Sequence, residues 1–294
     1  MSGPTHVHTP QEWETFLARK SFIELGAADR AVALLDAGSA RVILGPFDRL
    51  KSPWLPQQGI VAQADDGVVL TRGTIDGQPA VVAAIESAFQ GGSMGEVAGA
   101  KIAGALELTL ADHEKGVPTR PVILFETGGV RLQEANLGLA VIAEIHAAIV
   151  ALRPHTPVVG VVAGMVGCFG GMSLAATLCS HLIVTPQARL GMNGPEVIEQ
   201  EAGIQELDAS DKRLIWSLIG GEQRYATGLV DTLVDDDADA IAAAVRAAFK
   251  AGVPAQPRST RVDTFLERLA AYDTAAKPDP VALRAAWKTE GASK

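Results

Sequence analysis

Apolar and polar positions follow two different periods along this chain, and the change of period indicates its organisation. From about Gly59 the pattern becomes strand-like, with strands expected at 67–72 and 79–85, and Asp76-Gly77 between them is typical of a tight hairpin turn. Helical and strand-like segments then alternate, with helices expected at 95–113, 131–152 and shortly after Gly171, and strands at 121–126, 157–163 and 181–185. This alternation predicts right-handed crossovers and a mostly parallel sheet of the α/β class.

Helical patterns also occupy both ends of the sequence. Thr9, Pro10 and Glu12 resemble a capping box, which predicts a helix to about Lys20, and a second helix is expected at 29–37. The tail carries amphipathic segments at 211–218, 237–251, 263–272 and 280–288. We therefore predict an N-terminal helical extension at 1–28, a central domain at 29–252 and a helical C-terminal tail at 253–294.

Composition excludes several functional classes. With 48% hydrophobic residues the chain can form a large core, and its net charge of −9 lacks the positive field that general nucleic-acid binding requires. Cys168 and Cys179 are too few for a disulfide framework or a four-thiolate zinc site. We therefore expect reduced cysteines, no bound metal and no nucleic-acid partner. Because no apolar signal segment opens the sequence, we also expect a cytoplasmic protein.

One uncharged stretch, 156–188, is long enough to cross a bilayer if His181 is neutral. Several glycines and Pro157 interrupt it, and its apolar runs at 158–162 and 181–184 are typical of buried strands. We therefore predict no membrane span.

Glycine pairs mark the junctions at which predicted strands give way to helices. Because backbone N–H groups and helix N-termini meet at the carboxyl edge of a parallel sheet, such pairs suit an anion or an oxyanion. Any single pair is explained equally well by a tight turn, so the prediction rests on their common edge. The three pairs are Gly91-Gly92, Gly128-Gly129 and Gly170-Gly171.

The sequence GGSMG at 91–95 matches the nucleophile elbow of serine hydrolases. In that fold an acid and then a histidine follow the serine. His181 is the last histidine, a mostly helical tail follows it, and the others lie in or beside predicted helices or in the N-terminal tail. A serine hydrolase using Ser93 is therefore the second alternative function.

Four motifs in one order resemble the beta-type carboxyltransferase subunits of acyl-CoA carboxylases: FQGGSMGEV at 89–97, TGGVRLQE at 127–134, GGMS at 170–173 and GPEVIEQ at 194–200. Within that family the likeness is greatest to the beta subunits of biotin-independent malonate decarboxylases. The resemblance implies a crotonase-like fold, in which strand-strand-helix units form a superhelix rather than a flat doubly wound sheet.

In function, the resemblance implies a carboxy-lyase that works within a multisubunit complex. A malonyl group on the phosphopantetheine-type, dephospho-CoA-derived arm of an acyl-carrier subunit would lose CO2 and leave an acetyl thioester, with no cofactor bound covalently to this chain. The implied partners are a gamma-type carboxyltransferase subunit, the acyl-carrier subunit and an acyl-carrier transferase subunit. The first alternative is a carboxyltransferase that exchanges the carboxyl group of a malonyl or acyl-CoA thioester with biotin. A non-catalytic interaction protein is the last alternative.

The chemistry of this reaction indicates which residues form the site. Loss of CO2 from a malonyl thioester leaves an enolate oxygen, which requires preorganised hydrogen-bond donors. By position in the family, the catalytic donors are the backbone N–H groups of Gly128, Gly129, Gly170 and Gly171. An apolar wall would also weaken hydration of the leaving carboxylate. The substrate-binding candidates are Gly92, Ser93, Met94, Val130 and Met172.

Other residues in or near these motifs have structural interpretations. Arg131 and Glu134 are three apart and are expected to support the loop or a subunit interface. Glu196 stands where the carboxylase motif usually has arginine, and we expect it to be exposed at a helix N-terminus. Ser173 replaces the glutamate of the hydratases, and a four-cysteine zinc ribbon is absent, so hydration and ordinary acetyl-CoA carboxylation are disfavoured. For carrier docking the candidates are Lys101, Lys115 and Arg120.

Overall fold

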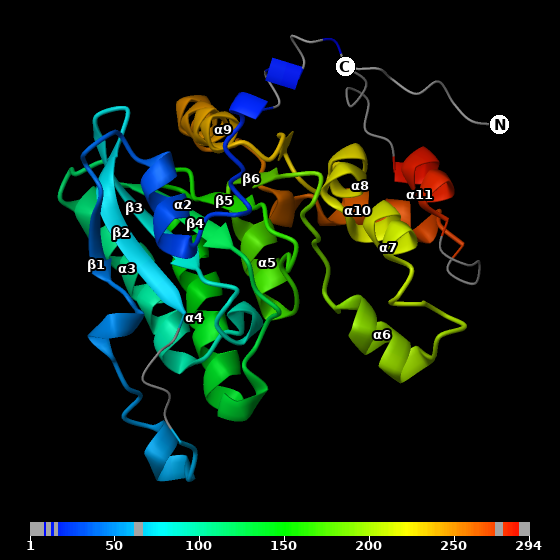
Figure 1. Ribbon diagram of the computed structural model, residues 1–294, viewed down its shortest axis with the longest axis horizontal. Helices are drawn as coiled ribbons and strands as arrows, with labels where there is room; N and C mark the ends of the chain where they lie inside the picture. Colours follow the sequence, from blue (N-terminus) through cyan, green and yellow to red (C-terminus); the bar gives the residue numbers. More distant parts are fainter. Residues whose placement is uncertain (1–8, 10–12, 15–16, 62–66, 274–278, 288–294) are drawn as a thin grey trace.

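The computed structural model describes residues 9, 13–14, 17–61, 67–273 and 279–287. Its centre is a seven-stranded sheet in which the spatial order of the strands equals their order along the chain (Figure 1). The first three strands pair antiparallel, and β3 to β7 pair parallel. The strands are β1 (Arg41–Leu44), β2 (Val68–Ile75), β3 (Gln78–Ile85), β4 (Arg120–Phe125), β5 (Val159–Val162), β6 (His181–Val184) and β7 (Thr232–Leu233).

The hairpin of β2 and β3 has the turn that the sequence predicts. Ile75 pairs with Gln78, and the two residues between them have positive φ angles, 49° at Asp76 and 73° at Gly77. Two left-handed residues in a two-residue loop match the right-handed twist of the flanking strands. The predicted hairpin is therefore confirmed.

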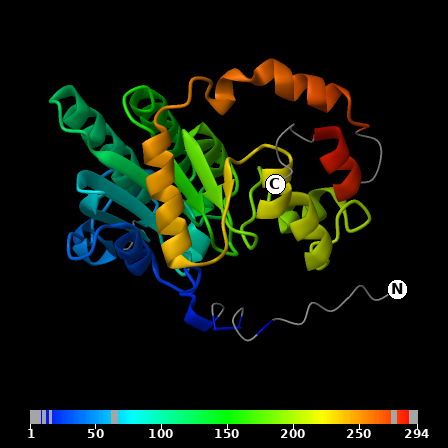
Figure 2. The same ribbon diagram turned by 90° about the horizontal axis from the view of Figure 1, so that it is seen from above.

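Helices cover both faces of the sheet, because alternate side chains of the strands point to opposite sides. Val81, Ala83 and Ile85 of β3 belong to one core, and Ala80 and Val82 belong to the other. On the first face lie α3 (Glu96–Glu114), α4 (Asn136–Leu152) and α5 (Gly171–Leu178). On the second face lie α2 (Ala27–Leu34) and α9 (Ala238–Ala251) (Figure 2).

One predicted helix begins later than expected. The prediction started it at residue 131, whereas a 3-10 turn occupies Leu132–Glu134 and α4 begins at Asn136. Ala135 interrupts the helical path with φ 47° and ψ −126°. The first part of the motif is therefore a shaped loop. Among the described strands and α-helices, β1, β7 and α8 (Gly221–Ala226) had no prediction of their own, and α6 (Pro195–Ala202) was expected only as a helix beginning near Glu196.

The tail is helical, as predicted, and lies beside the sheet (Figure 2). In the tail, α11 contacts α8 of the predicted central domain, where the Gln223 side-chain amide donates to the carbonyl oxygen of Pro280 at 3.1 Å. Residues 10–12 and 15–16 of the predicted N-terminal helix lie outside the described residues, and the described residues 13–14 and 17–18 are helical. The division at residues 28 and 252 stays a prediction. The tail helices are α10 (Val262–Ala270) and α11 (Pro280–Trp287), and α7 (Lys212–Ile219) precedes α8 in the central domain.

The uncharged stretch at 156–188 folds as β5, α5 and β6. In the ranges that the structure describes, no helix is both long enough and apolar enough to cross a membrane.

Candidate active site

The three glycine pairs lie at one edge of the sheet. Each pair is in the loop that follows a parallel strand, after β3, β4 and β5 respectively. Because these three strands are neighbours and run the same way, their carboxyl ends bring the loops together. The sequence prediction that the pairs share an edge is confirmed.

Backbone hydrogen bonds join the first two loops. Gly128 N–H donates to the Gly91 carbonyl at 2.9 Å, Met94 N–H donates to the Gly129 carbonyl at 2.7 Å, and Arg131 N–H donates back to Met94 at 2.8 Å. The last two bonds form a short parallel bridge outside the named strands. The parallel pairing therefore continues past the strand ends into the loops.

The second and third loops are joined in the same way. Thr127 N–H donates to the Gly167 carbonyl at 2.8 Å, and Phe169 N–H donates to the Thr127 carbonyl at 3.1 Å. Where these loops meet, a Cβ on Gly129 would lie 3.2 Å from the Phe169 oxygen and 3.4 Å from the Gly170 Cα. Backbone therefore faces backbone, and Gly129 also has a φ of 109° that side-chain-bearing residues rarely adopt.

The loop contacts decide which backbone N–H groups remain available. The Gly128 N–H is bonded to Gly91, the Gly170 N–H donates to the Met192 carbonyl at 2.8 Å, and the Gly129 N–H donates to Thr127 Oγ1 at 3.0 Å. Among the residues that the structure describes, the N–H groups of Val130 and Gly171 have no hydrogen-bond partner. A Cβ on Gly170 would lie 4.0 Å from Val130 N, so the space in front of that amide borders the third loop.

The apolar wall expected from Met94 and Met172 is not present. Both side chains have 0% exposure and belong to the core between the sheet and α3–α5. Gly92 is also buried, and a Cβ there would lie 2.0 Å from the Glu126 carbonyl oxygen. All three residues are therefore buried in the unbound chain, whereas Ser93 and Val130 are partly exposed at the loops, and substrate contact stays a prediction.

The expected support of the first loop by Arg131 and Glu134 is confirmed within the chain. Their buried side chains form an ion pair at 2.9 Å, and Glu134 Oε2 accepts the Glu96 N–H at the start of α3 at 2.7 Å. Arg131 also donates to the Ser93 carbonyl at 3.0 Å. The pair thus joins the loop after β4 to the loop after β3.

The same contacts disfavour Ser93 as a nucleophile. Its hydroxyl accepts a hydrogen bond from Arg131 Nε at 3.3 Å. No described histidine ring is hydrogen-bonded to it, and the rings of His113, His146 and His181 are bonded to backbone carbonyl groups elsewhere. A serine nucleophile requires an adjacent base, which the described residues do not supply.

The third loop is held from its far side by a stacked arginine. The Arg189 guanidinium carbon lies 5.5 Å from the Phe169 ring centre and 4.8 Å from that of Trp216. Its Nη2 donates to the Met165 carbonyl at 2.7 Å. Desolvation lowers the pKa of Arg189, although the nearby Glu196 carboxylate raises it. The loop after β5 is therefore fixed to α7.

The remaining sequence candidates form no hydrogen bond or ion pair with the glycine pairs among the described residues. Glu196 is exposed in the first turn of α6, as predicted, 3.7 Å from Lys212 Nζ. Lys101 is buried with its Nζ donating to the carbonyls of Gly45 and Val68, so its assignment to carrier docking is wrong. Lys115 follows α3 and Arg120 begins β4, so both lie at the amino end of the parallel strands.

Sequence reasoning missed the buried Glu126, which ends the apolar run VILFE immediately before the second glycine pair. A carboxylate directly after a buried strand requires a partner. That position was the available signal, and the partner is Arg30 of α2.

Residues 25–276 match the model of the carboxyl transferase domain family. The chain belongs to this family, as its four sequence motifs indicate.

Two solved structures and one curated relative show which members of the family this chain is similar to. A chain of a Pseudomonas malonate decarboxylase hetero-tetramer, solved in complex with malonate, is 62% identical with a TM-score of 0.88, over 94% of this chain and 100% of that one. A malonyl-S-ACP:biotin-protein carboxyltransferase of Malonomonas rubra is 42% identical over 232 residues, which are 76% of this chain and 73% of the relative. Transcarboxylase 12S is 26% identical with a TM-score of 0.61, over 80% of this chain and 42% of that one. The predicted crotonase-like α/β fold is confirmed.

Proposed function

We propose that this chain is the beta-type subunit of a malonate decarboxylase and forms one half of its active site. The substrate is a malonyl thioester on the phosphopantetheine-type arm of an acyl-carrier subunit. The bond between the α-carbon and the carboxylate breaks, CO2 leaves, and its bonding electrons form an enolate on the thioester. A proton from water or from the partner subunit then adds to the α-carbon to give the acetyl thioester.

The observation that supports this reaction is the pair of unpartnered N–H groups where two glycine loops touch. Val130 N–H and Gly171 N–H lie in adjacent loops, and Gly171 begins α5, whose dipole favours negative charge at that end. We assign the enolate oxygen to these two donors. Gly128, Gly129 and Gly170 then shape the loops, because their own N–H groups are already bonded.

Five exposed apolar side chains at the same edge support a gamma-type partner subunit there. Large apolar residues rarely form extended exposed surfaces on a chain that works alone. These residues lie in the loops after β4, β5 and β6 and in the first turns of α4 and α5. They are Leu132, Met165, Met192, Leu139 and Leu174, with exposures of 80%, 59%, 52%, 57% and 44%.

The carrier arm is expected to enter from this edge, between the two subunits. The charged candidates that remain, Lys115 and Arg120, lie at the other end of the strands, and Arg120 is already bonded to Asp76 and the Ile75 carbonyl. Docking of the carrier and of the acyl-carrier transferase subunit is therefore assigned to the partner or to the loop edge. The two free, buried cysteines are in keeping with the reducing cytoplasm.

The test uses this chain in complex with its gamma-type subunit and malonyl-charged carrier protein. We expect CO2 release without any biotinylated protein and unchanged release after Ser93→Ala. Gly170→Val should reduce kcat by about 100-fold, because its side chain would fill the space beside the Val130 amide. The matched control is Gly203→Ala, at another left-handed glycine with no atom within 4 Å.

A biotin-dependent carboxyltransferase is the second candidate, because the Malonomonas relative is named for transfer to a biotin protein. The enolate chemistry is the same, and only the acceptor of the carboxyl group differs. If release requires a biotinylated protein and avidin abolishes it, this second function replaces the first.

A further inference from the structure

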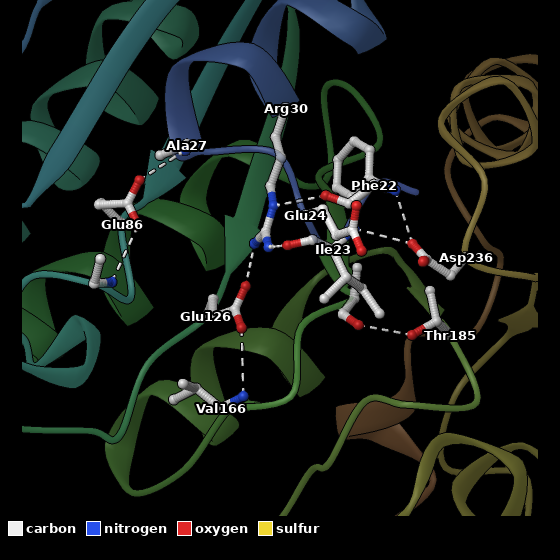
Figure 3. A network of polar contacts seen from close by, with 12 residues as sticks. Phe22, Ile23, Glu24, Ala27, Arg30, Glu86, Glu126, Val166, Thr185 and Asp236 are labelled. Carbon is white, nitrogen blue, oxygen red and sulfur yellow. Dashed lines mark hydrogen bonds and ion pairs between the residues drawn. The ribbon is translucent and has the colours of Figure 1, made fainter. Parts of the chain in front are cut away.

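Behind the glycine loops lies a buried polar network whose centre is Arg30 (Figure 3). Arg30 is 7% exposed on α2, and its guanidinium group uses all three nitrogens. Nε donates to the Phe22 carbonyl at 3.0 Å, Nη2 donates to the Ile23 carbonyl at 2.5 Å, and Nη1 forms an ion pair with Glu126 Oε2. One side chain thus joins α2, the segment before it and the carboxyl end of β4.

Glu126 connects Arg30 to the loops after β4 and β5. It directly precedes the Thr127-Gly128-Gly129 turn, and its second oxygen, Oε1, accepts the Val166 N–H in the loop after β5 at 3.3 Å. The carboxylate fills the space beside Gly164, where a Cβ would lie 1.7 Å from Oε1. The loops that carry the Val130 and Gly171 amides are therefore set against one carboxylate.

The first glycine loop is tied to the same helix. Glu86 directly follows β3, and its Oε2 accepts the Ala27 N–H at the start of α2 at 2.9 Å. Its Oε1 accepts the Ala88 N–H at 3.0 Å within the loop. The residues that follow β3 and β4 thus both contact α2 through a carboxylate, as Figure 3 shows.

The outer side of the network is anchored to a distant part of the chain. Asp236 Oδ1 accepts the N–H groups of Phe22 and Ile23 at 2.8 and 3.0 Å, and its Oδ2 accepts the Ser21 hydroxyl at 2.6 Å. Phe22 and Ile23 also supply the carbonyl oxygens that orient Arg30. The Phe22 and Ile23 carbonyls, which Asp236 holds in place, therefore orient the Arg30 guanidinium group toward Glu126.

We propose that Arg30 and Glu126 are positioning residues, which hold the loops after β4 and β5 at the separation that places the Val130 and Gly171 amides around one oxyanion. Neither residue touches substrate. A buried ion pair is weak evidence for a stabilising role, because a well-packed uncharged pair is often as stable. Geometry supplies the reason for the pair, since an error of about 1 Å in a reacting group can reduce the rate by about 100-fold. This inference rests on the proposed function.

The experiment compares two single variants with the double variant in the assembled complex. Arg30→Met and Glu126→Gln each leave a buried polar group without its partner, so both should lower Tm. The double variant removes both charges and should recover part of that Tm, although the Phe22 and Ile23 carbonyls still lose their donor. We expect its kcat to stay about 100-fold below wild type, with the KM for malonyl carrier changed less than about threefold. Recovery of kcat together with Tm would overturn the proposal, because the pair would then serve stability alone.

An ion pair at the other end of the strands, with a buried arginine and a partly exposed aspartate, supplies the control. Arg258 forms an ion pair with Asp231, whose Oδ2 accepts the Leu182 N–H at the amino end of the parallel strands. Asp231→Asn leaves the buried Arg258 without its charged partner, so it should lower Tm but leave kcat within about threefold of wild type. An equal loss of kcat in this variant would contradict a specific role for Arg30 and Glu126.

Hydrogen exchange separates failure of the inference from failure of the proposed function. In the Arg30→Met/Glu126→Gln complex, amides of 127–131 and 164–171 should exchange faster than in wild type, while those of β6 should not. This result does not depend on the reaction. Wild-type complex that fails to release CO2 would refute the proposed function, whereas unchanged exchange in the two loops would refute the positioning role.

Discussion

The two ends of the parallel strands carry opposite kinds of contact. At the amino ends, charged side chains form pairs, such as Arg120 with Asp76 at 3.2 Å and Arg258 with Asp231. At the carboxyl ends, the contacts between neighbouring loops run between backbone groups, and the charged pairs Arg30–Glu126 and Arg131–Glu134 are buried. The same strands therefore end in an ordinary charged surface on one side and in a backbone surface on the other.

This difference shows what glycine contributes to the site. A side chain at the loop contact would separate the loops, whereas two bare backbones approach within van der Waals distance. The approach leaves unpartnered N–H groups beside the N-terminus of α5, where the helix dipole has the correct sign for an anion. At the amino ends, helices present their C-termini, which favour cations instead.

The largest effect is expected from a side chain placed between the loops. Gly129→Ala introduces a Cβ 3.2 Å from the Phe169 oxygen at a φ of 109°, so we expect kcat to fall by about 100-fold. Release of CO2 by the purified complex measures it, and gel filtration checks assembly. The control at the other end is Gly116→Ala, which has a φ of 79° and open space, and should lose about 1 kcal/mol of stability with normal kcat. Equal kinetic losses would remove the distinction between the two ends.

One cysteine lies at each end of the parallel strands, and their buried thiols predict that stability depends on pH. Cys168 lies in the loop after β5, and Cys179 lies just before β6. Burial raises the pKa of Cys168 well above its ordinary value of 9.0 and that of Cys179 to about 12. Between pH 9 and 12 the unfolded chain therefore binds fewer protons than the native one, and stability falls as pH rises.

Urea unfolding at pH 8 and pH 10.5 measures this loss, which should be smaller in Cys179→Ala. Both thiols should also resist iodoacetamide at pH 8 until the chain unfolds. Rapid alkylation of either native thiol would show that its end of the sheet is open to solvent.

A moderate gain in stability is expected from Gly104→Ala, away from the glycine loops. Gly104 lies within α3 beside a cavity of about 380 Å³, and a Cβ there would meet no neighbouring atom within 4 Å. Alanine in a helix interior should add about 1 kcal/mol, with unchanged kcat. Thermal unfolding tests this, and a lower Tm would mean that the methyl group meets an obstruction.

The smallest effect is expected at the exposed pair of Arg72 and Asp112, which are 3.1 Å apart at the amino end. Arg72→Ala should change the unfolding free energy by less than about 0.5 kcal/mol, because solvent screens such pairs. Urea titration is the measurement. A change of several kcal/mol would show that side-chain pairs at this end matter more than the comparison implies.

Local chemistry makes much of the fold predictable. The Asp76-Gly77 turn, the alternation of strands and helices, and the glycine pairs each carry a short-range signal, and the structure confirms each of them. β1 escapes prediction because it has only four residues and no buried face, with its first three positions exposed. The late start of α4 escapes prediction because Ala135 has an unusual backbone conformation that its residue type does not announce.

The site is predictable to the level of its loops but not of its atoms. Sequence cannot show that Met94 points into the core, or that the Gly128 amide is bonded to Gly91, because both depend on how separate loops meet. Arg30 and Glu126 are 96 positions apart, so no local pattern pairs them. Lys101 is expected at the surface because most lysines are exposed, yet backbone carbonyls bind it inside.

The anchoring of residues 21–23 by Asp236 has a consequence for the order of events during synthesis. Each strand pairs with the next one along the chain, so the sheet can grow in step with the ribosome. The orientation of Arg30, however, depends on Asp236, which is translated 206 residues after Arg30. A nascent chain can therefore complete most of its sheet before Asp236 is available to orient Arg30, so on our proposal the glycine loops reach their final positions only late in synthesis.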